Sequence, residues 1–390
     1  MGLGFFLKQI KDNEMKKIIT AILALIAIPT VAQITGNGYY RIQNNGSERY
    51  ITITDNVLNN ISTSSTIIDY GNITTWFWDN VKSNPASIIY IKAVGSEYDI
   101  SAQGISVHDI TGGKAYVQLN QRGSDKSIYL IQASAKQGGV SVNKTLYDGS
   151  TSDEYDYVND DGKDTHKYWR IKPVDTEDNY IGITPTVQTN DGWYGTIYAS
   201  FPFKLASSGM TAYYVDGVHT GQFQWKEITD DVKPAATPMI IKCSSNDAAQ
   251  NMIIPVDAAT TAPTDNKLSG TLFASSLRNH QVRVEYDKNT MRVLGKDASG
   301  NLIFTEAESS YLTKSKYIPK NTAYLYDATG LTGDYVLVSR DTYSGISNIE
   351  ANPQKSAVKG TFTLSGVPVD DNKALRPGIY IKNGQKVVIK

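Results

Sequence analysis

The stretch that decides the fold is residues 38–56, which read GYYRIQNNGSERYITITDN. Apolar and polar residues alternate on both sides of a polar turn at 44–47, and alternation at period two is typical of a half-buried β-strand. Similar runs, rich in β-branched and aromatic residues, recur at 88–92, 127–131 and 335–339. No amphipathic helix of three turns is evident after the N-terminal segment, so we expect an all-β protein.

A weak threefold repeat runs through the first half of the chain. Each unit opens with a strand, passes through a polar turn into a second short strand, and closes with an aromatic strand. The opening strands are 40–43, 90–93 and 129–132, and the closing strands are 76–78, 116–119 and 168–171. Repeats of this length also occur in β-propellers, but a propeller needs at least four blades. Three units predict a closed barrel capped by hairpins.

The opening stretch and the closing residues 168–174 (YWRIKPV) resemble ricin-B-like β-trefoil modules, and we take residues 33–175 as a β-trefoil-like barrel domain. The resemblance implies a carbohydrate site that combines an Asp early in a repeat with an aromatic ring that stacks on the sugar. By position, Asp99 is the best match for this ligand-binding acid, and Asp55 is the next.

Tryptophan marks the closing strands of the repeat. Phe77-Trp78 and Tyr168-Trp169 stand where ricin-B-like modules have Gln-x-Trp. Because large aromatic side chains are mostly buried, we expect Trp76, Trp78 and Trp169 to fill the barrel core.

The second half carries a different repeat. Residues 232–242 (VKPAATPMIIK) and 317–327 (YIPKNTAYLYD) each place a proline-led turn before an apolar strand. They resemble a module of large exported proteins from gut and oral bacteria, which implies a β-sandwich-like spacer without an assigned activity. We predict two such modules, 176–262 and 263–344, with the small, polar stretch 256–267 as the linker between them.

The N-terminus has the pattern of a secretory signal peptide. A positive start precedes the apolar run 18–28, and the small residue Ala32 ends the segment. We predict that residues 1–32 are the signal peptide and that 1–14 are an upstream extension before Met15. A run of this length is too short to span the ~30 Å hydrocarbon layer as a helix.

The C-terminus has a second targeting pattern. Residues 378–390 read GIYIKNGQKVVIK, and the Asn-Gly pair at 383–384 favours a type I′ hairpin turn. Together with TLSGVPV at 363–369, this stretch resembles the sorting domain of type IX (Por) secretion cargo, over 345–390. The resemblance implies the type IX machinery as a partner, and a protein that is secreted or displayed on the outer-membrane surface of a Gram-negative bacterium.

The composition argues against several classes of partner and binding site. Lys plus Arg total 38 and Asp plus Glu total 39, so no basic excess exists for nucleic acid. The single cysteine, Cys243, excludes an intrachain disulfide and a Cys-rich zinc site, and its strand pattern predicts a buried thiol. The acidic stretch 153–164 departs from the EF-hand register and predicts an exposed loop rather than a calcium site. We expect no cofactor, no metal and no transmembrane segment in the mature chain.

No catalytic motif stands out. The four histidines lack metal-ligand spacing, and no nucleophile elbow or phosphate-binding loop occurs. We therefore predict a secreted or cell-surface carbohydrate-binding protein that is not an enzyme. Two alternatives stay open. One is a structural or adhesive surface protein that binds protein partners, and the other is a secreted glycan hydrolase whose two carboxylates meet only in space.

Overall fold

The computed structural model describes residues 34, 36–53, 73–106, 116–137, 140–148, 158–159, 165–274, 283–338, 361–363, 368–369, 377–382 and 385–389. The protein is all-β, as the sequence predicts. The described helices are short: α2 (Trp78–Val81), η1 (Pro85–Ser87), η2 (Thr165–Lys167) and η3 (Ala248–Gln250). The chain forms two compact units, residues 1–337 and 338–390.

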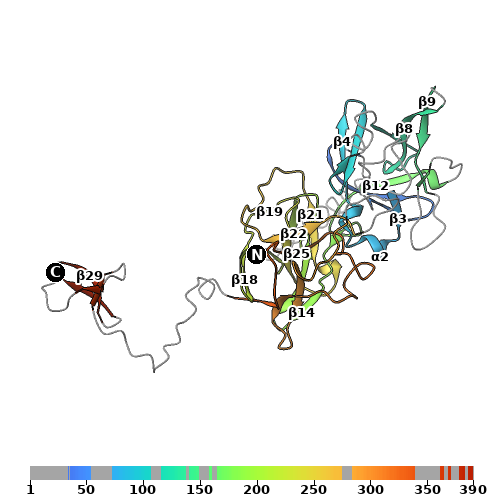
Figure 1. The fold of residues 1–390 in the computed structure, drawn as a ribbon. Helices are drawn as coiled ribbons and strands as arrows, with labels where there is room; N and C mark the ends of the chain where they lie inside the picture. The colour runs from blue at the N-terminus through green and yellow to red at the C-terminus, as the bar shows by residue number, and fades with distance from the viewer. Residues whose placement is uncertain are drawn as a thin grey trace, which may run out of the picture. The chain divides into compact units, whose positions relative to one another are not determined.

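Six strands of the first unit close into an antiparallel barrel (Figure 1, blue to green). Around the barrel the order is β1, β4, β5, β7, β8 and β12, and β12 pairs with β1 to complete the ring. The bounds are β1 (Gly38–Asn44), β4 (Ile89–Val94), β5 (Glu97–Ala102), β7 (Val117–Gln121), β8 (Ile128–Gln137) and β12 (Trp169–Pro173). The closing pair runs from Tyr40 opposite Pro173 to Asn44 opposite Trp169, so the first and last strands of the repeat lie side by side.

Three excursions leave the barrel, between β1 and β4, between β5 and β7, and between β8 and β12. The first contains the hairpin of β2 (Tyr50–Ile53) and β3 (Ile73–Trp76), and the second contains β6 (Ile105–Ser106). The third contains β9 (Val140–Thr145), which pairs with β8, and the pair β10 (Tyr147–Asp148) and β11 (Val158–Asn159). The order of barrel strand, excursion and barrel strand therefore occurs three times.

One tryptophan fills the barrel core, rather than the three that the sequence predicts. Trp169 is fully buried there, and its Nε1 donates a 3.0 Å hydrogen bond to the carbonyl of Leu146. The prediction for Trp76 and Trp78 is wrong, because both are half-buried and lie outside this core. Trp76 ends the β2–β3 hairpin and Trp78 begins α2, so neither belongs to a barrel strand.

Two further sheets follow the barrel within the first unit (Figure 1, green to orange). A four-stranded sheet has the order β13–β21–β16–β19, and a curled ten-stranded sheet has the order β14–β15–β20–β17–β18–β26–β24–β23–β25–β22. The bounds are β13 (Ile181–Gly182), β14 (Val187–Thr189), β15 (Gly192–Ile197), β16 (Phe203–Leu205), β17 (Thr211–His219), β18 (Gln222–Glu227), β19 (Val232–Lys233), β20 (Met239–Cys243), β21 (Met252–Pro255), β22 (Leu268–Thr271), β23 (Met291–Lys296), β24 (Leu302–Thr305), β25 (Thr322–Tyr326) and β26 (Tyr335–Leu337).

The ten-stranded sheet contains strands from both predicted modules, 176–262 and 263–344, and is buried on two faces. Met239 and Ile241 of β20 contact one hydrophobic core, whereas Ile240 between them contacts another. Alternate residues of a strand point to opposite faces, so β20 lies between two packed layers. Cys243, at the end of the same strand, is buried as expected.

The second unit contains a small sheet of order β28–β27–β29–β30. Its strands are β27 (Thr361–Thr363), β28 (Pro368–Val369), β29 (Gly378–Lys382) and β30 (Gln385–Ile389). The last two pair as the predicted hairpin, with Lys382 opposite Gln385. The turn at 383–384 and the predicted signal peptide, 1–32, lie outside the described residues. No described helix is both long and apolar enough to cross a membrane.

Buried contacts join the barrel to the sheets that follow it. Gln103 and Asn321 exchange two amide hydrogen bonds of 2.9 Å, and both side chains are buried. The backbone N–H of Gly182 donates a 2.9 Å hydrogen bond to the carbonyl of Lys82. Ile88, which lies directly before β4, packs into the same core as strands β16 and β21. Polar and apolar contacts therefore hold the barrel against the sheets. We call the region of these contacts the joint.

Two tyrosines in the joint make stability sensitive to alkaline pH. The rings of Tyr39 and Tyr90 lie 4.9 Å apart, and the Tyr90 hydroxyl donates a 2.7 Å hydrogen bond to Asp257. Burial first, and then the Asp257 carboxylate, raise the pKa of each tyrosine to about 12. Because both phenols ionise earlier in the unfolded chain, their contribution to stability is complete below about pH 10 and is lost as the pH rises to about 12.

We expect the urea concentration at the midpoint of unfolding to decrease as the pH rises from 10 to 12. Tyr90→Phe is expected to make this decrease with pH smaller, since one of the two phenols with a raised pKa is gone. The matched control is Tyr326→Phe, an exposed tyrosine on β25. An unchanged slope in Tyr90→Phe would contradict the assignment.

Candidate functional site

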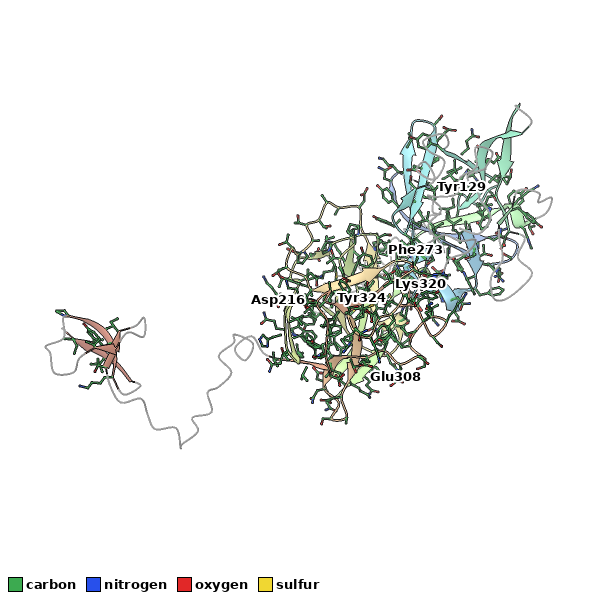
Figure 2. All side chains as sticks on the ribbon, viewed as in Figure 1. Tyr129, Asp216, Phe273, Glu308, Lys320 and Tyr324 are labelled. Carbon is green, nitrogen blue, oxygen red and sulfur yellow. The ribbon has the colours of Figure 1, made fainter. Side chains whose placement is uncertain are left out.

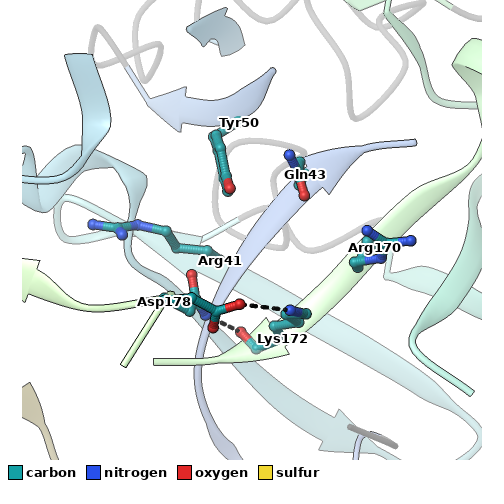
Figure 3. A pocket seen from close by; sticks show the side chains of 7 residues that line it. Arg41, Gln43, Tyr50, Arg170, Lys172 and Asp178 are labelled. Atoms are coloured by element: carbon teal, nitrogen blue, oxygen red, sulfur yellow. Dashed lines mark hydrogen bonds and ion pairs between the residues drawn. The ribbon is translucent and has the colours of Figure 1, made fainter. Parts of the chain in front are cut away.

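A polar pocket of about 180 Å³ lies on the outer surface of the barrel, beside the pair of β1 and β12 (Figure 3). Its walls come from β1, β2, β12 and the turn that follows β12. The lining residues are Arg41, Gln43, Tyr50, Arg170, Lys172, Asp178 and Asn179. All seven carry polar groups, which sets this pocket apart from the apolar barrel core behind it.

Strand alternation explains why polar side chains meet on this surface. Ile42 of β1 is buried in the barrel core, so its neighbours Arg41 and Gln43 point to the outer face. The same alternation along β12 places Arg170 and Lys172 on the outer face, on either side of a core isoleucine. Each strand thus contributes two polar residues, at alternate positions.

The register between strands completes the arrangement. Arg41 lies opposite Lys172, and Gln43 lies opposite Arg170. Directly opposed residues of an antiparallel pair lie on the same face, with their Cβ atoms about 5 Å apart. Tyr50 of β2 lies opposite Gln43 on its other side, so its ring forms one wall of the pocket.

The turn after β12 supplies a carboxylate, that of Asp178, to the lining. Asn179 donates its side-chain N–H groups to the carbonyls of Lys172 at 3.2 Å and Pro173 at 2.6 Å, and its backbone N–H donates to Asp175 Oδ1 at 3.0 Å. These bonds hold the turn against the strand. The exposed Asp178 then lies with Oδ2 3.5 Å from Lys172 Nζ, and one of the two dashed lines in Figure 3 marks this ion pair.

The guanidinium of Arg41 points away from the other pocket groups, so its stem lines the pocket (Figure 3). It donates hydrogen bonds to three oxygens: Ser87 Oγ at 3.1 Å, Tyr180 O at 2.6 Å and Val81 O at 2.8 Å. The ring of Trp78 lies 4.9 Å from its central carbon. Burial lowers the pKa of Arg41 to about 9, which leaves the group charged at neutral pH. Arg41 thus belongs to the joint as well as to the pocket.

Aromatic rings border the pocket on the α2 side. The Tyr50 ring lies 5.5 Å from that of Trp78, which meets Tyr180 edge-on at 5.2 Å. Burial raises the pKa of Tyr50, so its phenol is protonated at neutral pH and can donate a hydrogen bond. This side of the pocket therefore offers ring surface and one hydroxyl donor.

Of the two acids that the sequence predicts, the structure describes only Asp99, and Asp99 is not found in this pocket. Asp99 lies half-buried on β5, opposite Lys92, and is not among the lining residues. Asp55 lies outside the described residues. The pocket has a sequence signal that the prediction missed. YRIQ at 40–43 and WRIK at 169–172 place polar residues at the same alternate positions of two strands that pair.

Elsewhere in the barrel domain, the buried carboxylate of Asp148 accepts hydrogen bonds from Ser47 Oγ and, at 3.1 Å, from Thr75 Oγ1. Among the described residues, no group of three or more His, Cys, Asp or Glu side chains is placed to bind a metal ion. Burial raises the pKa of Cys243 to about 12, so this thiol stays protonated at neutral pH.

Comparisons with known proteins add no assignment for this chain. No protein-family model, no curated protein and no solved structure matches it. The resemblances to ricin-B-like modules and to sorting domains therefore stay predictions. The chemistry of the pocket is the basis on which a function can be proposed.

Proposed function

We propose that this protein binds a glycan, and that the pocket beside β1 and β12 receives a sugar unit. The observation that carries the proposal is the convergence of an amide (Gln43), a carboxylate (Asp178) and two cations (Arg170 and Lys172) on one concave surface. Sugar hydroxyls donate to carboxylates and accept from cations, and charge-assisted hydrogen bonds are stronger than neutral ones. The ring of Tyr50 adds an apolar wall for a sugar face.

The charges of the pocket favour an acidic glycan. Lys172 is 3.5 Å from Asp178, and Arg170 is 3.7 Å from Asp125, so both ion pairs are long and partly exposed. A carboxylate or sulfate on the sugar would offer these cations shorter, charge-assisted hydrogen bonds. Among the described residues, Asp178 is the carboxylate of the lining, and its pairing with Lys172 suits a role in holding a ligand, so we propose binding as the function of this pocket.

We further propose that the barrel is a β-trefoil and that the protein is exported. A closed six-stranded barrel with three excursions supports the first proposal. The charged start and apolar run within residues 1–32 support cleavage by signal peptidase, and the pattern of 345–390 supports type IX secretion to the cell surface or the medium.

Binding is tested on a glycan array with residues 33–390, followed by titration of the best ligand. Lys172→Gln is expected to weaken binding of an acidic glycan by about tenfold or more, since it removes a charge-assisted hydrogen bond. Asp178→Asn is expected to leave that affinity unchanged or to raise it, because a competing negative charge is lost. The matched control is Lys204→Gln on β16, an exposed lysine that pairs with Asp231 at 2.5 Å.

Three results would change the proposal. A folded sample that binds no glycan would refute it. A loss of binding in Asp99→Asn, with Lys172→Gln unchanged, would move the sugar site to β5. Equal weakening by Asp178→Asn and Lys172→Gln would indicate a neutral sugar.

A second candidate function is adhesion to a protein partner, and an aromatic patch favours it. Phe77 is 41% exposed, and its neighbours Trp76 and Trp78 are half-buried. The guanidinium of Arg49 lies 4.8 Å from the Phe77 ring. Tryptophan and arginine are enriched among residues that dominate protein interfaces. If the array is negative, loss of cell or matrix adhesion in Phe77→Ser would support this function.

A further inference from the structure

Another pocket, of about 260 Å³, lies in the joint, on the outer face of the barrel. Its walls come mainly from strands β1, β4, β5 and β6 and from residues 200 and 201, which lie just before β16. The lining residues that are exposed or half-buried are Tyr39, Tyr90, Ser101, Gly104, Ser106 and Ser200. We call this cavity the tyrosine pocket.

Four of these residues form one row across neighbouring strands. Tyr39 of β1 lies opposite Tyr90 of β4. On its other side Tyr90 lies opposite Ser101 of β5, and Ser101 in turn lies opposite Ser106 of β6. The residue after each tyrosine belongs to the barrel core, so the tyrosines point outward, and opposed residues of paired strands share a face. Four hydroxyl side chains therefore line the outer surface over three strand spacings, about 14 Å.

Contacts across the joint fix the tyrosine end of the row. The Tyr90 hydroxyl donates a 2.7 Å hydrogen bond to Asp257, which follows β21 of the four-stranded sheet. The Tyr39 ring lies 4.9 Å from that of Tyr90 and 5.6 Å from the buried ring of Phe201. The two tyrosine rings are thus held in place from both sides of the joint.

The serine end of the row is held by the turn between β5 and β6. Gln103 in this turn donates a 2.8 Å hydrogen bond to the carbonyl of Leu272, which directly follows β22. The next residue, Phe273, is buried and is labelled in Figure 2. The turn is therefore fixed to the sheets, and the pocket is largely formed before a ligand arrives, as is usual for small-molecule sites.

Several hydroxyls in the pocket are open to a ligand. Those of Tyr39, Ser101 and Ser200 make no hydrogen bond with any residue that the structure describes, and all three side chains are half-buried. The Tyr90 hydroxyl donates to Asp257 and keeps its oxygen as an acceptor. Because a hydroxyl can both donate and accept, the row offers both functions beside two aromatic rings.

The charges around the pocket disfavour an anion. Its described lining residues are all uncharged. The exposed carboxylate of Asp257, bonded to Tyr90, places a negative charge at one edge. This is the reverse of the pocket at β1 and β12, where two cations meet one described carboxylate.

We propose that the tyrosine pocket binds an uncharged sugar unit, whose ring face contacts Tyr39 and Tyr90 and whose hydroxyls bond to the row. Sugar hydroxyls donate and accept as the row does, and the tyrosine rings supply the apolar surface against which a sugar face packs. This proposal rests on the proposed glycan binding and adds to it a second site with a different charge preference.

The probes are methyl β-glucoside and methyl β-galactoside, titrated into residues 33–390 and followed by the ring NMR signals of Tyr39 and Tyr90. We expect binding on the order of millimolar, which suits a ligand of so few atoms. The double variant Tyr39→Phe with Ser101→Ala loses two hydroxyls but keeps the ring, and is expected to weaken binding about tenfold. Tyr326→Phe is the matched control, because Tyr326 is exposed on β25 and lies outside the pocket lining.

The position of the shifts and the charge of the probe separate this site from the pocket at β1 and β12. Methyl β-glucuronide, which carries a carboxylate, is expected to bind the tyrosine pocket at least threefold more weakly than the glucoside, because Asp257 repels it. Shifts at Tyr50 alone would overturn this proposal and leave glycan binding standing. No shift with either neutral probe, unchanged affinity of the folded double variant, or equal affinity for the glucuronide at Tyr39 and Tyr90 would each overturn it as well.

Discussion

Replacement of Arg41 by methionine is expected to lower the free energy of unfolding by about 3–5 kcal/mol. Arg41 is 1% exposed, and its guanidinium donates to three oxygens, two of which are main-chain carbonyls of Val81 and Tyr180. Methionine keeps much of the stem but donates no hydrogen bond. The Val81 carbonyl keeps a 3.0 Å hydrogen bond from the N–H of Asn84, so the Tyr180 carbonyl is the acceptor most affected, and a buried acceptor left without a donor costs about 1–3 kcal/mol.

The loss of the Arg41 hydrogen bonds is expected to weaken the joint as well as the barrel. Val81 ends α2, next to the barrel, whereas Tyr180 directly precedes β13 of the four-stranded sheet. One guanidinium therefore bonds two parts of the unit that are separated by about a hundred residues of chain. Arg41→Lys is expected to recover only part of the stability, because an ammonium cannot reproduce the planar fork.

Urea denaturation checks this prediction, with Arg170→Met as the matched control. Arg170 is on the partner strand and is partly exposed, with its nearest carboxylate at 3.7 Å, so its loss is expected to change stability by less than about 1 kcal/mol. If Arg41→Met unfolds at the same urea concentration as Arg170→Met, the bonds of Arg41 contribute little and the joint is not held by this residue.

Local patterns predicted the strands well because strand formation depends on neighbouring residues. The alternation in 38–56 corresponds to β1 and β2, with Ile42 inside the barrel and Arg41 and Gln43 outside. The C-terminal hairpin was also predicted, since an Asn-Gly pair between two apolar runs specifies both the turn and the pairing. The aromatic positions were predicted less well. Trp76 and Trp169 look alike in the repeat, but only the second lies on a barrel strand.

The candidate site was not predicted, because it depends on which strands pair. Arg41 and Lys172 are 131 residues apart and become neighbours only when β12 closes on β1. Asp178 joins them through a turn whose conformation is set by Asn179. The pattern within one repeat predicts Asp99 on β5 as the site acid, whereas the pocket is lined by residues from both ends of the barrel sequence.

The joint could not be predicted either, because its contacts also join residues that are far apart in the sequence. Gln103 and Asn321 exchange two hydrogen bonds, although the sequence assigns them to different predicted domains. Asn321 lies in the proline-led turn of the repeat at 317–327, but that pattern does not identify its partner, and a Gln or Asn in a turn is ordinarily expected to be solvent-exposed. A contact of this kind depends on how distant parts of the chain pack together, so no local sequence pattern predicts it.

Replacement of Gly182 by alanine is expected to destabilise the protein by about 3 kcal/mol, the second large effect. Gly182 is buried on β13, and a Cβ atom built there would lie 2.0 Å from the main-chain oxygen of Ala248. That oxygen belongs to η3 and already accepts a 3.0 Å hydrogen bond from the N–H of Asn251. The required space is therefore occupied by backbone rather than by a side chain that could rotate.

The backbone around Ala248 cannot move aside at small cost, because it is bonded to a buried side chain. The Asn251 side chain is fully buried, donates to the carbonyls of Ile183 and Ser245 at 3.0 and 2.8 Å, and accepts from the N–H of Ser244 at 2.9 Å. A shift of η3 would break several of these bonds together. A shift of β13 would instead break the bond of its own N–H to the barrel.

Thermal or urea unfolding of Gly182→Ala measures the effect, and Gly38→Ala on β1 is the matched control. At Gly38 the nearest atom to a new Cβ is a ring carbon of Tyr40 at 3.3 Å, a contact that a shift of a few tenths of an ångström relieves, so a change below about 1 kcal/mol is expected. Adding Ala248→Gly to Gly182→Ala tests the cause. The closest atoms are the main-chain oxygen and carbon of Ala248, at 2.0 and 2.6 Å, and its methyl carbon is farther away at 3.0 Å, so this second substitution is expected not to restore stability. Recovery in the double variant would show that side-chain crowding limits the site, and the joint would then tolerate residues larger than glycine.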